Sequence, residues 1–396
     1  MAITVGIPRE TFPGERRVAI TPRACQALQK FGVEQIVEHL AGVQAGFPDE
    51  NYVESGARMA RRADLFAQAD IIIQARCLGA NPDEGRADLT LFRPGQLLVG
   101  FGEPLTAAQE ATELAATGVS FLAMELIPRI TRAQSMDALS SMATVAGYEA
   151  VLLAATALPK IFPMMMTAAG TITPAKVFVL GAGVAGLQAI ATARRLGAVV
   201  SAYDVRPAVK EQVESIGAKF VVLDVEDRAA EDRGGYAKAM DESFYQRQRE
   251  LLTNILRKQD VVITTAAVPG RKAPVLITAE MAGAMTPGSV IVDIAAERGG
   301  NCELTRPGET IVNRGVTILG PVNLPSMAPR DASLMYASNI TALLRLLIQD
   351  GTLMLNLEDE IIRGALVTHA HRVVHPRVCE ILGLSSVSFD KRLVQS

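Results

Sequence analysis

The stretch VFVLGAGVAGLQAIATARRLGAVVSAYDVR, residues 177–206, carries the strongest structural signal in the chain. It opens with an apolar run that predicts a buried strand. Gly181, Gly183 and Gly186 follow in the spacing G-x-G-x-x-G, at the start of a helical pattern. A second strand pattern ends at Asp204, at the distance of about 20 residues that a dinucleotide-binding fingerprint requires. The stretch therefore predicts a strand–turn–helix–strand unit that binds a dinucleotide.

Each part of this fingerprint has a physical role. Gly181 permits the tight turn, Gly183 lets the backbone approach a pyrophosphate, and Gly186 lets the helix pack closely on the strand. The helix N-terminus offers N–H groups and a positive dipole end to phosphate. Asp204 can accept hydrogen bonds from the adenosine ribose and would repel a 2′-phosphate, which favours NAD(H) over NADP(H). Arg206 leaves NADP(H) open, because an arginine can pair with that phosphate.

Buried strands alternate with amphipathic helices along the whole chain. Before the fingerprint, the strand candidates are residues 3–7, 35–40, 69–76, 96–101 and 119–126. From the fingerprint onward they are residues 176–180, 199–204, 219–224, 260–266, 289–294 and 316–321. Such a pattern predicts parallel sheets covered by helices on both faces. We therefore expect an α/β fold with two Rossmann-like, doubly wound parallel-sheet domains, the second inserted in the first.

The length of 396 residues fits two domains better than one compact core. A long helix at 135–158 is expected to bridge the domains, and a helix at 331–351 is expected to return to the first. The predicted domains are residues 1–138 with 328–382, residues 139–327, and a polar tail at 383–396.

Composition narrows the functional class. The formal net charge of -3 argues against a nucleic-acid-binding protein that neutralises many phosphates. No basic leader followed by an apolar run precedes the first strand, and Pro159, Lys160 and Pro163 interrupt the most membrane-like segment. We expect a cytoplasmic chain with no direct membrane insertion.

Cysteine and histidine give no metal signature. The cysteines are scattered and fit reduced, buried thiols, namely Cys25, Cys77, Cys302 and Cys379. His369, His371 and His375 lie close together near the end of the chain, but no nearby carboxylate or cysteine completes a ligand set. No metal site is predicted.

Five motifs support a wider resemblance that covers nearly the whole chain. They are GIPRE, ERRVAITP, GAGVAGLQAIATARRLGA, VPGRKAPVLIT and VIVDIAAERGGN. These motifs resemble those of two related families, alanine dehydrogenase and the NAD(H)-binding α subunit of proton-translocating nicotinamide nucleotide transhydrogenase.

The first domain separates the two families. In alanine dehydrogenase a lysine and a histidine bind the amino acid and handle the proton, and the matching residues here are Arg76 and Glu103. Arg17 matches the arginine that binds the substrate carboxylate. Oxidising an amino acid must release protons, so the loss of both groups should disable that reaction. By contrast, PRITRAQSMDALSS resembles the R-x-x-x-x-Q-x-x-D loop of the transhydrogenase α subunit.

This second resemblance implies specific site residues. The loop supplies Arg129, Gln134, Asp137 and Ser140 as the catalytic set. The implied NAD(H) contacts are Val184, Asp204, Val205, Arg206, Gly235, Gln248 and Ala267. Ala267 is smaller than the apolar residue expected there.

Residues 226–250 contain GGYAKAM, which resembles the family's mobile loop. It could fold over the nucleotide with Tyr236 and Met240 as apolar contacts, or be an exposed insertion that touches nothing. The segment SMDALSS could also simply start a helix with Ser135 as its N-cap, a reading that is compatible with a functional role.

Transfer of hydride from NADH to NADP⁺ needs no general acid or base, because no hydroxyl or amine is made or broken. The required groups are positioning groups. Arg129 can pin a carboxamide, ribose or phosphate oxygen, Gln134 can donate and accept at once, and Asp137 can hold ribose hydroxyls or orient Arg129.

The resemblance also implies partners. NADP(H) would bind to another component, and a membrane-spanning component would couple transfer to proton movement. The chain is expected to be a homodimer, peripheral on the cytoplasmic face of the inner membrane, and either a split subunit or the soluble part of a longer one. Two alternatives stay open, an alanine dehydrogenase-like enzyme and a non-catalytic NAD-binding regulator.

Overall fold

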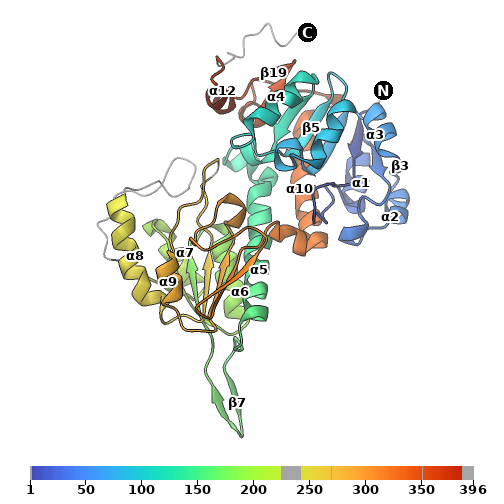
Figure 1. Ribbon diagram of the computed structural model, residues 1–396. Helices are drawn as coiled ribbons and strands as arrows, with labels where there is room; N and C mark the ends of the chain where they lie inside the picture. The colour runs from blue at the N-terminus through green and yellow to red at the C-terminus, as the bar shows by residue number, and fades with distance from the viewer. Residues whose placement is uncertain (1, 224–241, 269, 350, 386–396) are drawn as a thin grey trace. The chain divides into compact units, whose positions relative to one another are not determined.

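The computed structural model describes residues 2–223, 242–268, 270–349 and 351–385. The chain divides into two compact units (Figure 1), unit 1 with residues Met1–Met142 and Ser326–Ser396, and unit 2 with residues Ala143–Pro325. The chain passes from the first unit to the second within helix α5 (Ala138–Ala157). That either unit is a domain able to fold alone, with the boundaries expected above, stays a prediction.

Unit 1 is built on an eight-stranded sheet. Its strand order is β19-β18-β6-β5-β4-β1-β2-β3. The strands are β1 (Thr4–Ile7), β2 (Glu34–Glu38), β3 (Arg58–Ala60), β4 (Ile71–Arg76), β5 (Leu97–Phe101), β6 (Ser120–Ala123), β18 (Leu366–His369) and β19 (Arg372–Val373). β1 to β6 pair in parallel, whereas β18 is antiparallel to both of its neighbours. Every strand expected in this part of the chain is present.

The helices of unit 1 follow the expected apolar patterns. They are α1 (Pro22–Gln29), α2 (Asp49–Glu54), α3 (Arg62–Gln68), α4 (Ala108–Ala116), α10 (Pro329–Leu347), α11 (Glu360–Ala365) and α12 (Pro376–Leu382). α1 begins after Thr21 with Pro22 in its first turn, where the missing N–H of proline costs nothing. α10 ends at Leu347, before the expected end, because the chain turns there into the short strands β16 (Ile348–Gln349) and β17 (Thr352–Leu353).

Unit 2 is built on a seven-stranded sheet with the order β11-β10-β9-β12-β13-β15-β14. The strands are β9 (Lys176–Leu180), β10 (Val199–Tyr203), β11 (Lys219–Phe220), β12 (Val261–Thr264), β13 (Val290–Asp293), β14 (Thr310–Asn313) and β15 (Val316–Leu319). All pairs are parallel except that of β14 with β15. The order reverses between β10 and β12, on either side of β9, which is the switch point where such sheets bind ligands.

Helices cover both faces of the second sheet, as the alternation of side chains in β9 shows. Val177 and Val179 pack in one apolar cluster with α5 and α6 (Val184–Arg195). Phe178 and Leu180 pack in another cluster with α8 (Glu242–Leu256) and α9 (Ala279–Gly283). The short helix α7 (Lys210–Ser215) adds Val213 to the first cluster. The predicted α/β fold with parallel sheets is confirmed.

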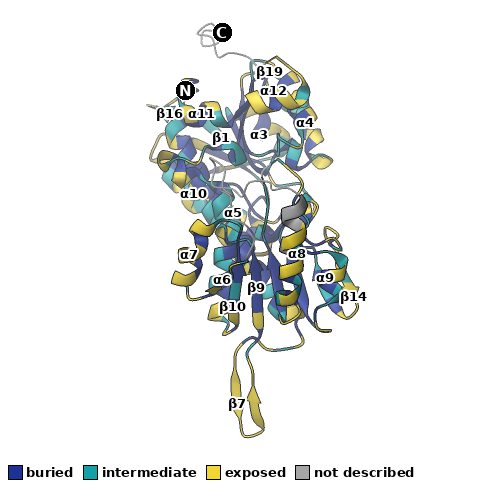
Figure 2. Ribbon diagram, turned by 90° about the vertical axis from the view of Figure 1, so that its left-hand side faces the viewer, coloured by how far each residue is buried: buried dark blue, intermediate teal, exposed yellow. Residues whose placement is uncertain are grey.

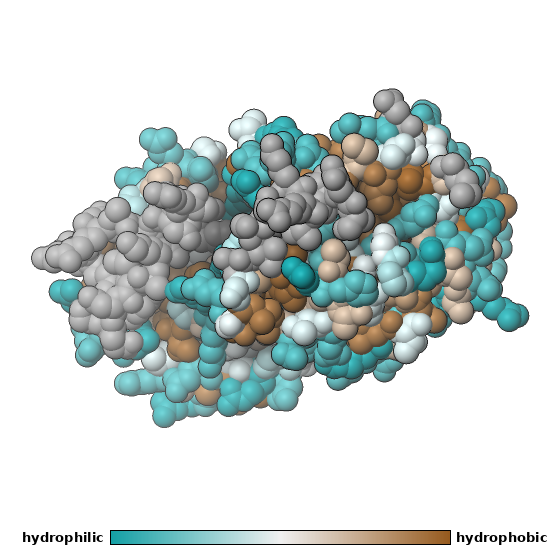
Figure 3. Space-filling view, turned by 90° about the horizontal axis from the view of Figure 1, so that it is seen from above, coloured by the Kyte–Doolittle hydropathy of each residue, from teal (hydrophilic) through white to brown (hydrophobic). Residues whose placement is uncertain are grey.

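A two-stranded hairpin of β7 (Met165–Thr167) and β8 (Gly170–Ile172) was not expected from the sequence. It projects from unit 2 and its residues are exposed on both strands (Figure 2). Within the described ranges, α5 is the one helix long and apolar enough to cross a membrane, but half of its most apolar window is buried inside the molecule. The core helix of a globular protein passes the same test. The face in Figure 3 is largely hydrophilic, with separate apolar patches.

Candidate functional site

The fingerprint glycines form the turn between β9 and α6. Gly181 has φ +95°, a left-handed conformation that favours glycine. A side chain at Gly186 would overlap the carbonyl oxygen of Gly181, so the helix lies directly against the turn. A Cβ atom at Gly183 would meet only the Arg206 guanidinium, at 3.9 Å. Space therefore remains open at the one glycine that is expected to face a pyrophosphate.

The first turn of α6 lies next to this open space. Gly183 is its N-cap residue and supplies no side chain to cap the helix, and Val184 follows as the first helical residue, 39% exposed. Uncapped N–H groups at a helix N-terminus attract anions, since the helix dipole is positive there. On the opposite side, the α5 residue Gly147 lets that helix approach so closely that a side chain there would overlap the Ala185 carbonyl.

Asp204 follows β10 and is held over the glycine turn. Its Oδ2 accepts a hydrogen bond from the Ala182 N–H at 2.7 Å. Arg206 donates from Nε to Oδ1 and from Nη2 to Oδ2, each at 2.9 Å, and its backbone N–H also donates to Oδ1. Val205 lies between them, half-buried. The carboxylate that was expected to bind ribose is therefore fixed by the glycine turn on one side and by Arg206 on the other.

The segment after β12 lies beside the glycine turn. Thr265 donates from its backbone N–H to the Leu180 carbonyl at 2.8 Å and from its hydroxyl to the Gly181 carbonyl at 3.0 Å. Ala266 and Ala267, the second of which is a predicted cofactor contact, follow it and are half-buried. These residues form the wall of the switch-point crevice on the side of β12.

Two polar residues after β13, missed by the sequence analysis, hold this wall. Asp293 is fully buried and accepts hydrogen bonds from the hydroxyls of Thr264 and Thr305. It also accepts from the N–H of Asn301, whose side chain bonds to Ala266. The signal for both was present in the motif VIVDIAAERGGN, where an acid and an amide follow a buried strand.

The Arg129–Ser140 segment lies in unit 1 as a 3₁₀ helix, η5 (Thr131–Met136), followed by α5. Ala133 and Met136 anchor it by burial, while the side chains of Arg129 and Gln134 are exposed. The segment thus presents these two predicted residues to the surroundings on a buried apolar base.

Asp137 and Ser140 are locked together at the start of α5. Asp137 Oδ1 accepts from the Ser140 N–H at 2.9 Å, and Oδ2 accepts from the Ser140 hydroxyl at 2.6 Å. α5 begins at Ala138, so Asp137 is the N-cap residue and the reading of Ser135 in that role is wrong. Ser135 lies earlier, in η5, where its carbonyl accepts from the Asn339 amide at 2.9 Å. A carboxylate at the N-cap also favours the helix dipole.

A buried ionic cluster occupies the positions that correspond to amino-acid chemistry. Arg17 donates to both oxygens of Glu15, from Nε at 2.8 Å and from Nη2 at 2.6 Å. Burial opposes ionisation, but the charge and hydrogen bonds of Arg17 lower the pKa of Glu15 to about 2. Arg76 lies 3.4 Å from Glu15 through Nε and stacks over the Phe12 ring at 4.2 Å. The arginine that was expected to bind a substrate carboxylate thus already holds an internal one.

Two further carboxyls belong to this part of unit 1. Glu10 accepts from the N–H groups of Ala75 and Arg76, and burial followed by the charge of Glu15 raises its pKa to about 8. Glu125 accepts from the N–H groups of Gly102 and Glu103, and burial together with the charge of Glu103 raises its pKa to about 7. Glu103 has φ +47°, a left-handed conformation.

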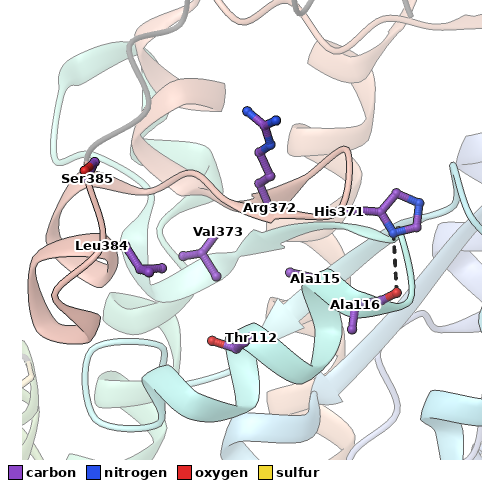
Figure 4. A pocket seen from close by; sticks show the side chains of 8 residues that line it. All are labelled: Thr112, Ala115, Ala116, His371, Arg372, Val373, Leu384 and Ser385. Atoms are coloured by element: carbon purple, nitrogen blue, oxygen red, sulfur yellow. Dashed lines mark hydrogen bonds between the residues drawn. The ribbon is translucent and has the colours of Figure 1, made fainter.

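The three C-terminal histidines point to different partners. His369 bonds to the Ser120 hydroxyl at 2.9 Å, and His371 lies 3.3 Å from the Ala116 carbonyl, at the rim of a shallow depression (Figure 4). His375 is buried, and burial lowers its pKa to about 4. No group of three or more potential metal ligands occurs among the residues that the structure describes. The depression is lined by Thr112, Ala115, Ala116, His371, Arg372, Val373, Leu384 and Ser385.

Four predicted contacts cannot be placed. Gly235, Tyr236 and Met240 lie outside the described residues. Gln248 lies on α8, but only its backbone is within the described range.

Comparisons with known proteins agree with the resemblance seen in the motifs. Residues 6–146 match the family model described as alanine dehydrogenase/PNT, N-terminal domain, and residues 150–376 match alanine dehydrogenase/PNT, C-terminal domain. The first segment of the NAD(P) transhydrogenase subunit alpha of Rhodospirillum rubrum is 47% identical over 376 residues, covering 94% of this chain and 98% of that protein. The alanine dehydrogenase of Mycolicibacterium smegmatis is 28% identical over 390 residues, covering 96% of this chain and 97% of that protein.

A solved structure agrees. The crystal structure of transhydrogenase from Sinorhizobium meliloti has a TM-score of 0.84 at 44% identity, and covers 94% of this chain and 100% of that chain. Identity to the transhydrogenase proteins is higher than to the alanine dehydrogenase, which confirms the resemblance drawn from the first domain. The chain therefore belongs to the alanine dehydrogenase/PNT family, and within it to the branch of the NAD(P) transhydrogenase alpha subunits.

Proposed function

We propose that this chain binds NAD(H) in unit 2 and takes part in direct hydride transfer between NADH and NADP⁺ held on a partner component. The observation that carries the proposal is the glycine turn with its open space at Gly183, bounded by the α6 N-terminus and the fixed carboxylate of Asp204. A dinucleotide pyrophosphate and ribose need these three features together. The proposed cofactor contacts are Gly181, Gly183, Val184, Gly186, Asp204, Val205, Arg206, Gly235, Tyr236, Met240, Gln248 and Ala267.

The pairing of Asp204 with Arg206 favours NAD(H) at this site. Arg206 already directs two side-chain donors to Asp204, so a 2′-phosphate would have to compete with an internal carboxylate. That phosphate would also approach the Asp204 charge, which repels it. Both effects support an NAD(H) site here, with NADP(H) on another component.

Arg129, Gln134, Asp137 and Ser140 are the proposed catalytic set. Bound NADH supplies the hydride, and these residues supply no proton, since the transfer needs none. Asp137 is held in one orientation by Ser140, which leaves Arg129 and Gln134 as the exposed groups on a fixed mount. A rigid mount lowers the cost of holding a ring in the reactive orientation.

The proposal extends to the assembly. We infer a homodimer that works in the cytoplasm, held on the cytoplasmic face of the inner membrane by membrane-spanning and NADP(H)-binding components that couple transfer to proton movement. The β7–β8 hairpin supports self-association, because Met165, Met166 and Ile172 are each about half exposed or more. Exposed apolar strands of this kind are typical of contact surfaces. Sedimentation of the native chain and of a Met165→Ser, Met166→Ser variant tests this, and a monomeric native chain would contradict it.

The test of the hydride reaction mixes the purified chain with an NADP(H)-binding transhydrogenase component and follows exchange between NADH and an NAD analogue. The rate should depend on NADP(H) and fall at least about a hundredfold in Arg129→Ala and Gln134→Asn, the size of loss typical of a removed transition-state contact. The exposed Arg132→Ala, on the same 3₁₀ helix, is the matched control and should retain the rate. NADH binding without exchange, across several partner components, would favour the regulatory alternative.

The alanine dehydrogenase alternative has its own assay. Because Glu15 already occupies the Arg17 guanidinium, we expect no NADH formation from alanine by the chain alone. Formation of NADH under those conditions would mean that Arg76 or Glu103 acts on an amino acid after all.

A further inference from the structure

Asn301 is a fully buried amide at the end of the GGN turn after β13, and every polar atom of its side chain is used. Its Oδ1 accepts from the Ala266 N–H at 3.0 Å. Its Nδ2 donates to the Ala266 carbonyl at 2.8 Å and to the Pro274 carbonyl at 2.9 Å. The opposite orientation of the amide would set its oxygen against two carbonyls, so the network fixes this one.

The backbone of Asn301 is equally constrained. Its N–H donates to Asp293 Oδ2 at 2.7 Å, and its carbonyl accepts from the N–H groups of Leu276 and Ile277. A side chain held in this way cannot shift without breaking buried hydrogen bonds. Asn301 therefore ties both ends of the 266–274 loop to the carboxyl end of β13.

This anchor acts on the crevice wall. Ala266 is bonded through both its N–H and its carbonyl, as a residue in the middle of a sheet would be, although β12 ends at Thr264. Thr265, one residue before, is bonded to the glycine turn. The short segment between the turn and Asn301 is thus held from both sides, and Ala267 follows directly.

We propose that Asn301 is a positioning residue for the nicotinamide half of the bound cofactor, acting through Ala266 and Ala267. This inference rests on the proposed NAD(H) site. Asp204 follows β10, on one side of β9, and the Asn301-anchored segment follows β12, on the other side. A dinucleotide lies across the switch point with its adenosine ribose at the acidic residue, so the remaining half faces β12.

The experiment measures dissociation constants for NADH and for ADP, which carries only the adenosine half and phosphates. Asn301→Ala should raise the Kd of NADH at least about tenfold, the effect of about 1.4 kcal/mol of lost binding. The Kd of ADP should stay within about twofold, because Asp204 and the glycine turn are untouched. Titrations are run at a temperature where thermal melting shows each variant fully folded.

Thr305→Val is the matched control. It removes one buried hydrogen bond to Asp293 at nearly constant volume, from the same loop, but makes no contact with Ala266. It should lower the melting temperature while leaving both dissociation constants within about twofold. If Asn301→Ala does not fold, Asn301→Asp keeps the size and the acceptor for the Ala266 N–H, loses the donors to both carbonyls, and should show the same split between NADH and ADP.

Parallel weakening of NADH and ADP, or no weakening of NADH, would overturn the positioning role and leave Asn301 a purely structural residue. A native chain that binds ADP but not NADH contradicts it as well. A native chain that binds neither contradicts the proposed function itself, and this inference falls with it.

Discussion

Asp204 and Arg206 form a two-point ion pair at the end of β10, with both nitrogen–oxygen distances at 2.9 Å. The same carboxylate accepts from the Ala182 N–H in the glycine turn. One acidic residue thus links the strand end, the turn and the arginine that would otherwise be available to a phosphate. This relationship is the structural basis for expecting NAD(H) rather than NADP(H) in unit 2.

Replacing Asp204 should change cofactor preference as well as affinity. In Asp204→Ala, NADH loses its ribose acceptor while Arg206 loses its internal partner. We expect the Kd of NADH to rise about tenfold or more and the ratio of NADPH to NADH affinity to shift toward NADPH. Fluorescence titration with both nucleotides measures this, and the exposed Glu211→Ala on α7 serves as the control. An unchanged ratio would show that the ion pair does not set the preference.

Gly183 and Gly186 should respond differently to a single added methyl group. Gly186→Ala would overlap the Gly181 carbonyl, so we expect a loss of about 1–3 kcal/mol in the free energy of unfolding. Gly183→Ala meets only Arg206 in the free protein, so its stability should change little while NADH binding weakens sharply. Chemical denaturation and NADH titration of both variants check this. Equal stability losses would mean that the open space at Gly183 is not a ligand surface.

The N-cap of α5 gives a prediction that separates stability from activity. Asp137→Ala removes the acceptor for both donors of Ser140 and should cost about 0.5–2 kcal/mol of stability. Asp137→Asn keeps a capping oxygen and should recover most of that loss. If Asp137 also contacts the cofactor, the hydride-exchange rate should stay low in Asp137→Asn despite the restored stability. Recovery of both properties together would assign Asp137 a capping role alone.

Glu10 should make stability depend on pH. Its folded pKa, about 8, lies above the ordinary value of 4.5, because burial disfavours the charged form. The folded state therefore binds more protons than the unfolded state between these values, so the stability that Glu10 contributes is full below pH 4.5 and is lost as pH rises through 8. Glu10→Gln should remove that loss, so the free energies of unfolding of the two proteins should diverge by at most about 1.4 kcal/mol per pH unit.

The control for this measurement is Glu34→Gln, an exposed glutamate on β2 in the same unit. Denaturation curves at about pH 5, 6, 7 and 8 should show the native slope in Glu34→Gln and a flatter one in Glu10→Gln. A native protein whose stability rises with pH over this interval would contradict the raised pKa of Glu10.

Much of the fold was predictable because its strands are continuous apolar runs. The runs at β9, β10, β12 and β13 are buried on both faces, and such strands give a strong periodic signal. The β7–β8 hairpin carries no such signal, since its side chains are exposed and no core selects its register. The antiparallel pair of β18 and β19 was missed for a related reason, because each strand is short.

The polar site was less accessible to sequence reasoning. The glycines and Asp204 stand at fixed spacing within one local motif, so they could be found. Asn301 and Asp293 act through hydrogen bonds to residues 35 and 29 positions away, which periodicity cannot detect. Ser135 was assigned as a cap instead of Asp137 because the preceding 3₁₀ helix and α5 read as one continuous pattern.

The most direct test of the account is the fate of the transferred hydrogen. NADH labelled with deuterium at the reacting C4 position is mixed with the native chain, NADP⁺ and an NADP(H)-binding transhydrogenase component in ordinary water. If hydride passes directly between the rings, mass spectrometry should find the deuterium in NADPH, with none lost to solvent. NADPH without the label would mean that a protein group or water relays the hydrogen, and would contradict the account.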